Sequence, residues 1–165
     1  MDYDAFLKRV KRWGGMTRRR EAELAISATI RALREALADD EADALARELS
    51  PPLARLMQSR CLAVRLGAKE LYERASRYEG VSPRFAMEHV QAVCQALASV
   101  LPPVCIARIS RAAPELAPLF VVPDRDSHPP TVFSTDARTL AAGHPGSDHP
   151  LSEAHPVHSD GSPSR

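Results

Sequence analysis

The sequence predicts an all-α protein in which two pseudo-repeated helical lobes pack as one bundle and a disordered C-terminal tail follows. Three observations support this prediction. Apolar residues recur at the spacing of amphipathic helices, and no segment reads as a credible strand. Aromatic residues make up only 5% of the chain, which favours helices packed through small side chains over a β-sandwich. A short phrase also occurs twice, as RWGGMT from Arg12 and as RYEGVS from Arg77.

The helical spacing predicts the elements of each half in order. In the first half we expect a helix at about 3–13, a long helix at 18–38, a shorter helix at 41–49 and a turn or short helix at 51–58. The corresponding segments of the second half are about 66–78, 83–100, 103–111 and 114–120. The nearest approach to a strand is the short apolar run LFVV at 119–122.

The apolar stripes of the two halves match at a nearly constant offset. The long helix of the first half has the stripe Ile26, Ile30, Leu33 and Leu37, and 64 positions later the second half has Val90, Cys94, Leu97 and Leu101. The stripes that precede the repeated phrase also match, Phe6, Val10 and Trp13 with Leu71, Ala75 and Tyr78. The small changes in offset fall in loops, as expected of a duplicated helical unit.

The repeated phrase predicts a joint between two helices. Its glycine, Gly15 or Gly80, can adopt the left-handed conformation that ends a helix. The aromatic residue before the glycine is expected to be the last anchor of the apolar stripe, and the hydroxyl residue after it to cap the next helix. The predicted role of the joint is therefore structural, and the residues that carry it are Trp13, Gly15, Thr17, Tyr78, Gly80 and Ser82.

The composition of the chain changes near residue 122. Residues 121–165 hold seven of the fourteen prolines, five of the six histidines and more acidic than basic residues. Such a segment cannot bury enough apolar surface to offset the entropy of ordering it. We therefore expect a duplicated helical domain at 1–122, with repeat one at about 2–58 and repeat two at about 66–121, and a disordered tail rich in Pro, His and Ser at 123–165.

The first 121 residues resemble a bacterial family of proteins of unknown function, the domain-of-unknown-function family 2267. The resemblance is carried by MDYDAFLKRV, TRRREAELAISATIRALREAL and DDEADALARELSPPLARLM in the first half, and by GAKELYERASRYEGVSPRFAMEHVQAVCQAL in the second. It implies an all-helical, internally duplicated fold, no established reaction and no catalytic residue. In the second half, LPPVCIARISRAAPELAPLF is an apolar, proline-broken departure from the pattern, which weakens the expected symmetry of the lobes there.

The remaining composition sets the expected location and partners. A net charge of +1 gives no overall attraction to nucleic acid or membrane. No apolar run is long enough to span a bilayer, and the N-terminus lacks the hydrophobic region of a signal peptide. We therefore expect a cytoplasmic protein. The three cysteines, Cys61, Cys94 and Cys105, contain no CxxC pair and are expected to be buried thiols.

A basic cluster near the N-terminus is the strongest local signal. It holds seven cations within thirteen residues, namely Lys8, Arg9, Lys11, Arg12, Arg18, Arg19 and Arg20. It is a possible anion-binding surface for the phosphates of nucleic acid or of lipid headgroups. The competing and favoured interpretation is a solvated helix face that is partly paired with acidic residues, because the cluster contains no recognisable groove-reading motif.

The histidines indicate no site with comparable strength. The tail histidines His128, His144, His149, His155 and His158 are widely spaced and have no nearby cysteine. His89, beside Glu88 and close to Cys94, is a possible acid–base group, but Cys94 lies on the predicted buried stripe. The sequence therefore predicts no catalytic residue, no metal site and no cofactor.

Three functions remain open at this point. The leading hypothesis is a non-enzymatic protein-interaction or adaptor module of a bacterial cytoplasm, which binds an unknown protein or itself through helix grooves. The alternative is a nucleic-acid or anionic-surface binder that uses the basic cluster. The third is an enzyme of unnamed class, which a deep pocket holding a titratable group with a shifted pKa would favour.

Overall fold

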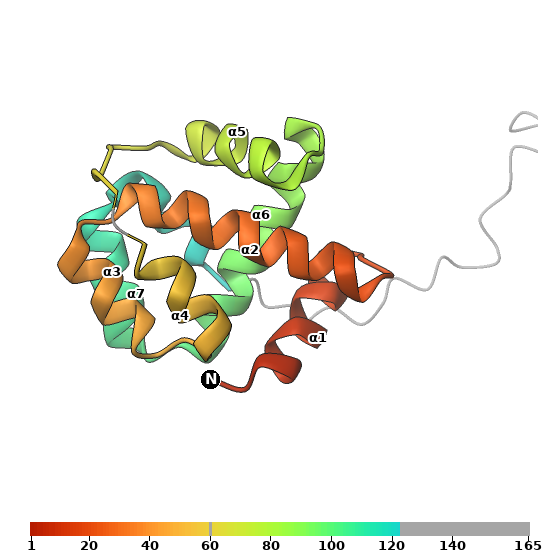
Figure 1. Ribbon diagram of the computed structural model, residues 1–165, viewed down its shortest axis with the longest axis horizontal. Helices are drawn as coiled ribbons and strands as arrows, with labels where there is room; N and C mark the ends of the chain where they lie inside the picture. Colours follow the sequence, from red (N-terminus) through yellow and green to blue (C-terminus); the bar gives the residue numbers. More distant parts are fainter. Residues whose placement is uncertain (60, 123–165) are drawn as a thin grey trace, which may run out of the picture. The chain divides into compact units, whose positions relative to one another are not determined.

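The computed structural model describes residues 1–59 and 61–122, and their regular secondary structure is helical, without any strand. The tail predicted at 123–165 lies outside the described residues. The elements, coloured along the chain in Figure 1, are α1 (Tyr3–Trp13), α2 (Arg19–Ala36), α3 (Asp39–Ala46), α4 (Pro51–Met57), α5 (Ala68–Glu79), α6 (Pro83–Val100), α7 (Pro103–Ala112) and the 3-10 helix η1 (Pro114–Phe120). The predicted all-α fold is confirmed.

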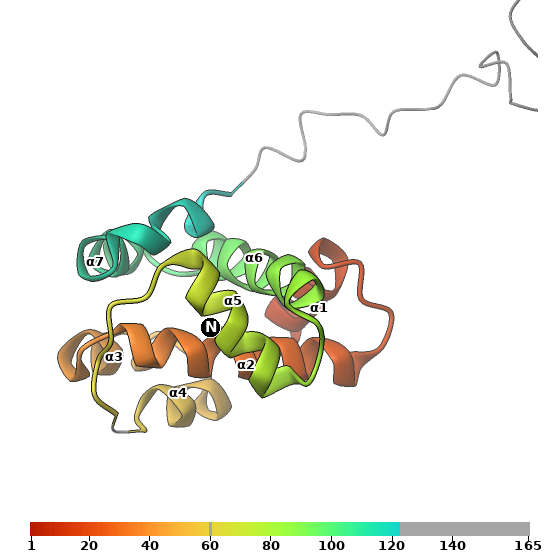
Figure 2. The same cartoon turned by 90° about the horizontal axis from the view of Figure 1, so that it is seen from above.

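The duplication is visible in both the order and the packing of the elements. The long helices α2 and α6 each have 18 residues, and α6 begins at Pro83, 64 positions after the start of α2 at Arg19. The two long helices pack against each other, and each also carries the first helix of the other repeat, because α1 packs on α6 and α5 packs on α2 (Figures 1 and 2). The two repeats therefore interlock as one bundle.

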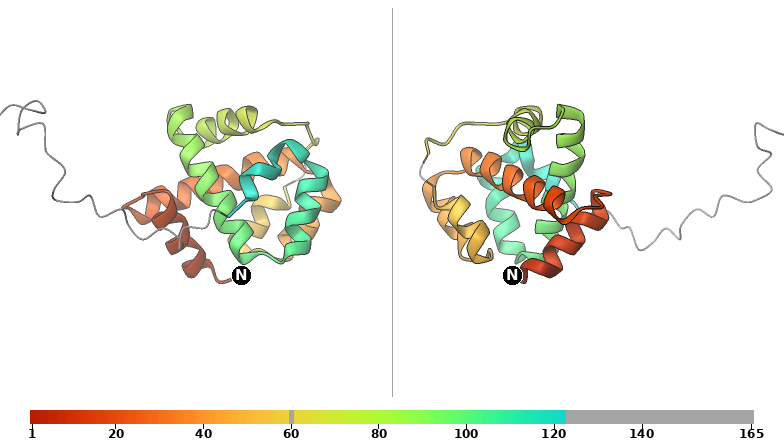
Figure 3. Two further views of the ribbon diagram at one scale, coloured as in Figure 1. Left: turned by 180° about the vertical axis from the view of Figure 1, so that it is seen from behind. Right: turned by 45° about the vertical axis from the view of Figure 1, so that its right-hand side comes forward.

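The two ends of the bundle are formed by different helices. At one end α3 packs against both α4 and α7, whereas α1 lies at the other end against α2 and α6 (Figure 3). The short helices α4 and η1 occupy matching places, α4 on α2 and η1 on α6. The first joint lies beside the middle of α6, because a Cβ atom at Gly14 would lie 3.4 Å from the Cβ atom of Ala92.

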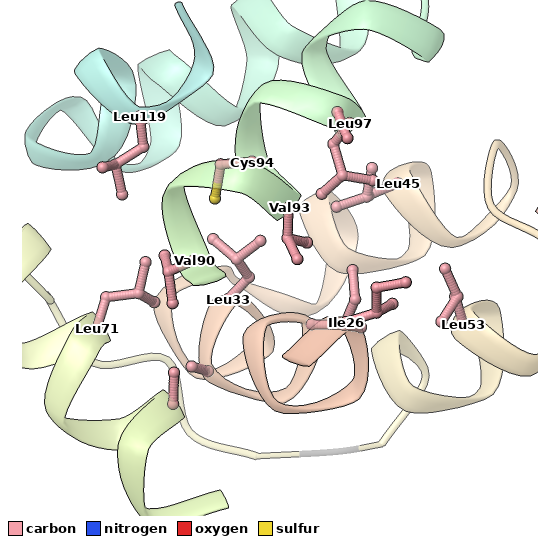
Figure 4. Close-up of a cluster of buried hydrophobic side chains, with 14 of the residues drawn as sticks. Ile26, Leu33, Leu45, Leu53, Leu71, Val90, Val93, Cys94, Leu97 and Leu119 are labelled. Atoms are coloured by element: carbon pink, nitrogen blue, oxygen red, sulfur yellow. The ribbon is translucent and has the colours of Figure 1, made fainter. Parts of the chain in front are cut away.

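The predicted apolar stripes form the centre of the core. All eight stripe residues of the two long helices are buried, as Figure 4 shows for Ile26, Leu33, Val90, Cys94 and Leu97. Leucines from four other elements close around them, Leu45, Leu53, Leu71 and Leu119. Removing side chains of this size from water stabilises the fold by about 1.5–3 kcal/mol each.

The two joints have the same backbone geometry, which explains the repeated phrase. Gly15 and Gly80 have φ angles of +64° and +76°. After each glycine the next amide N–H donates to a carbonyl five residues earlier, from Met16 to Lys11 at 3.0 Å and from Val81 to Ser76 at 3.3 Å. This hydrogen bond is the signature of a Schellman helix end, which requires a residue in the left-handed region.

Two side chains of the joints differ from the predictions. Thr17 is exposed and does not cap α2, because Arg18 occupies the N-cap position and makes no side-chain cap hydrogen bond. Ser82 does occupy the N-cap position of α6, but it too makes no such hydrogen bond. In the last turns, Trp13 is half-buried against the core, whereas Tyr78 is 45% exposed.

The exposure of Tyr78 has a physical reason. Its hydroxyl donates to the carboxylate of Glu35 on α2, and the guanidinium of Arg31 lies 5.9 Å from its ring centroid. A tyrosine with a polar partner and a cation over its ring is stable at the surface. It therefore bridges α5 to α2 instead of filling the core.

The irregular stretch of the second half keeps the duplicated architecture. α7 takes the place of α3, and the two pack against each other. The last element, η1, is a 3-10 helix rather than an α-helix, and it contains Pro118. Proline has no N–H to donate and clashes with an α-helical turn, which disfavours an α-helix in this segment. The run at 119–122 forms no strand, because Leu119 and Phe120 are buried within η1.

Candidate binding groove between the helix joints

The basic cluster does not act as one uniform surface. Arg9 donates to the hydroxyl of Ser99 at 2.7 Å and lies over the ring of Trp13. Arg19 is paired with Glu23 at 2.7 Å and with Asp4 at 3.2 Å. Lys11 is half-buried, whereas four of the seven cations are exposed and form no ion pair within residues 1–59 and 61–122, namely Lys8, Arg12, Arg18 and Arg20.

Two of these free arginines line a groove between the joints. The groove has a volume of about 470 Å³. Its walls come from the start of α2 and from the joint between α5 and α6, because α2 packs on both of those helices. We call it the joint groove, and its residues are Thr17, Arg18, Arg20, Glu21, Leu24, Glu79, Val81 and His89.

A buried histidine–carboxylate pair forms part of the wall of the joint groove. The Nδ1 atom of His89 lies 2.6 Å from Oε1 of Glu79, and the side chains are only 8% and 4% exposed. The hydrogen bond with Glu79 raises the pKa of His89, whereas burial lowers it. The negative charges of Glu79, Glu21 and Glu88 also raise this pKa. The pair thus favours the protonated imidazolium.

The sequence pointed to His89 but not to its partner. In the sequence Glu88 and Cys94 are the neighbours of His89, whereas in the structure the residue that contacts the ring is Glu79, across the turn at Gly80. Cys94 is fully buried, and burial raises the pKa of its thiol, so it adds no thiol chemistry to the groove. The repeated joint was the one feature of the sequence that could have indicated Glu79 as the partner of His89, since a chain reversal at Gly80 brings the end of α5 against the start of α6.

The joint groove also offers apolar surface at its edge. Leu24 lines the groove and is 45% exposed. Phe85, which is 57% exposed, precedes His89 by four residues and therefore shares its face of α6. These two side chains give the surroundings of the groove an apolar component that a partner could bury.

The start of α2 adds backbone donors to the same place. The first turn of an α-helix has N–H groups without intrahelical partners, and α2 has no side-chain cap to accept from them. Arg18, Arg20 and Glu21 of this turn all line the groove. Positive charge from the helix dipole and from the two arginines therefore converges there.

A second hollow is lined by Arg34, and each of the three guanidinium nitrogens of this buried arginine has a partner. Arg34 is only 2% exposed, and it donates to the carbonyl oxygens of Ser59 at 2.6 Å and Leu37 at 2.8 Å while pairing with Asp39. These bonds close the end of α2 and hold the following chain. We assign Arg34 a structural role.

Metal chemistry finds no support in the described part of the chain. Residues 1–59 and 61–122 contain no group of three or more His, Cys, Asp or Glu side chains that could hold a metal ion. The five tail histidines considered above lie outside the described residues. Within the described residues no helix is both long enough and apolar enough to cross a membrane.

Fold and groove together define an internally duplicated, all-helical domain with a charged groove where its two helix joints meet. A family model described as an uncharacterized conserved protein (DUF2267) matches residues 3–119. The chain therefore belongs to the DUF2267 family, as its sequence motifs indicated. No curated protein and no solved structure matches it.

Proposed function

We propose that this protein is a non-enzymatic protein-interaction module of the bacterial cytoplasm, and that the joint groove is its partner-binding site. The observation that carries the proposal is the open groove, lined by both halves of the duplication, with the exposed side chain of Leu24 in its wall. Removing exposed apolar surface from water on a partner favours association.

The groove has the mixed character of a protein interface. Its charged groups are Arg18 and Arg20, and its apolar members are Leu24 and Val81. Interfaces combine an apolar centre with arginine and a polar rim in this way. No nucleophilic side chain contacts His89 among the described residues, so the His89–Glu79 pair supports binding better than it supports covalent catalysis.

A pull-down with matched variants tests this proposal. The full-length protein would capture partners from a nuclease-treated lysate of the native cell, and Leu24→Ser and Phe85→Ala would each be compared with Val104→Ser. Val104 is 73% exposed on α7 and does not line the groove. We expect Leu24→Ser to reduce recovery of the partner at least about fivefold, as interface anchors do, and Val104→Ser to leave it unchanged.

Equal recovery of the partner by Leu24→Ser, Phe85→Ala and the unaltered protein would show that the partner binds elsewhere. Far-ultraviolet circular dichroism of each variant would verify that the helices remain intact. Leu24 in the groove and Phe85 beside it are both exposed, and substitutions at exposed positions usually change stability by no more than about 0.5 kcal/mol.

The second candidate is a binder of nucleic acid or of another anionic surface. The observation that favours it is the exposure of Lys8, Arg12, Arg18 and Arg20 without an ion pair in the described part of the chain. Phosphate binding would weaken steeply with salt, with a slope set by the number of phosphates contacted. Loss of binding in Lys8→Ala/Arg12→Ala together with a steep salt slope would favour this candidate over the first.

A further inference from the structure

We propose that the joint groove binds a carboxylate of the partner, beside an apolar side chain, between the guanidinium groups of Arg18 and Arg20 and the imidazole of His89. This inference rests on the proposed function, and it specifies the chemistry that the groove selects. The occupant is a peptide segment in which an acidic residue adjoins an apolar one.

The charge in the groove matches one negative charge. Two arginines and a protonated His89 face two glutamates, Glu21 and Glu79, which leaves a single positive charge. A carboxylate neutralises that charge. A phosphate group carries about −1.5 to −2 near neutral pH, and it would leave excess negative charge beside the two glutamates.

His89 lines the groove and has one ring nitrogen whose partner is known. Nδ1 is held by Glu79 at 2.6 Å, so Nε2 is the ring nitrogen without a hydrogen-bond partner among the described residues. When the ring is protonated, Nε2 donates a hydrogen bond as well. A charge-assisted hydrogen bond to a carboxylate is roughly twice as strong as a neutral one.

Arg18 and Arg20 suit the same ligand. Neither is consumed by an ion pair in the described residues, whereas Arg19 between them is paired twice. A guanidinium group binds a carboxylate through two parallel hydrogen bonds. The exposed side chain of Leu24 lies in the same wall, four residues after Arg20, and would contact the apolar neighbour of the carboxylate.

Nuclear magnetic resonance of the His89 ring is the direct test. The probes are acetyl-leucyl-glutamate amide, its glutamine counterpart and inorganic phosphate, each titrated into the full chain. His89→Gln assigns the ring signal among the six histidines. We expect a saturable shift with the glutamate peptide, with a Kd on the order of 1 mM, and none with the glutamine peptide.

Two double variants of equal charge provide the control. Arg18→Ala/Arg20→Ala and Lys8→Ala/Arg12→Ala each remove two cations, but only the first pair lines the joint groove. We expect the first to weaken the glutamate peptide at least about tenfold, and the second to change its affinity less than about twofold. If both double variants weakened the binding of the glutamate peptide equally, the peptide would be held by the overall positive charge and not by the joint groove, and the inference would be overturned.

The pH dependence of the affinity for the glutamate peptide is an independent test of the role of His89. The charged groups around His89 are Glu79 on α5, Arg18, Arg20 and Glu21 on α2 or at its start, and Glu88 on its own helix. Affinity for the glutamate peptide should fall as pH rises and the ring loses its proton, and His89→Gln should abolish that change. An affinity independent of pH in the unaltered protein would contradict the role given to His89.

The outcomes separate this inference from the proposed function. If Leu24→Ser abolishes capture of the partner while the glutamate and glutamine peptides bind equally, the proposed function is supported and the proposed carboxylate site is wrong. If phosphate binds more tightly than the glutamate peptide, the ligand is a free or lipid phosphate and the inference is overturned. If the glutamate peptide binds as expected but Leu24→Ser captures the partner normally, the site is correct and the function assigned to it is wrong.

Discussion

Single residues at the joints set where the chain turns, and the two glycines test this most simply. A Cβ atom at Gly15 or Gly80 would meet no atom within 4 Å, so the cost of a side chain there is the left-handed backbone alone. We expect Gly15→Ala and Gly80→Ala to lower the free energy of unfolding by about 1–2 kcal/mol each. Urea unfolding would measure this loss.

Asparagine supplies the matched control for these glycines. It adopts the left-handed region more readily than alanine does, so Gly80→Asn should cost less than Gly80→Ala. If both substitutions at position 80 left stability unchanged, the left-handed helix end would not be the reason for the repeated phrase.

The His89–Glu79 pair predicts how stability changes with pH. The pKa of His89 is raised in the folded state by its hydrogen bond to Glu79. The resulting stabilisation is fully present below the unfolded pKa of about 6.5, and it is lost as pH rises through the folded pKa. We expect Tm to fall as pH is raised from 5.5 to 8.5, by roughly 4 °C for each kcal/mol lost in a helical domain of this size.

Substitution of either partner checks the origin of that change. Differential scanning calorimetry of His89→Gln and Glu79→Gln should show a smaller fall of Tm over the same range. An unchanged pH dependence in both variants would assign the effect to other groups.

At the scale of elements, helices were easier to predict than the contacts between them. The bounds of α1 and α6 follow directly from apolar spacing, glycine and proline, and the structure repeats them at Tyr3–Trp13 and Pro83–Val100. Spacing alone could not reveal that Tyr78 would be exposed, because that depends on Glu35 and Arg31 of a helix in the other repeat.

The joint groove was beyond sequence reasoning for the same reason. The sequence identified Arg18, Arg20 and His89 separately, as parts of a basic cluster and as a possible acid–base group. Only the packing of α2 against α5 and α6 brings them together. The partner of His89 also depends on how the chain turns at Gly80, and periodicity does not specify that direction.

The packing of α2 gives a prediction at this scale. Leu33 is fully buried at the centre of the core, whereas Leu62 is 91% exposed. Leu33→Ala should lower the free energy of unfolding by about 2–5 kcal/mol, because it removes apolar contacts and leaves a cavity. Leu62→Ala, the same chemical change at the surface, should alter it by less than about 0.5 kcal/mol in the same denaturation experiment. Equal effects would mean that α2 is not the central helix of the fold.

For residues 1–122 as a whole, the exchange of first helices makes the duplication a single unit. α1 completes the second repeat by packing on α6, and α5 completes the first by packing on α2. Neither repeat therefore has a full set of contacts within its own sequence. The joint groove is a product of this exchange, since its walls come from both repeats.

Hydrogen–deuterium exchange of the full chain, measured with and without the captured partner, shows whether the partner of this protein binds in the joint groove. We expect binding to slow exchange in the segments 17–24 and 79–89, which contain the lining residues of the groove. Slowed exchange confined to 8–12, or to α7 at 103–112, with no change in the groove segments, would contradict it.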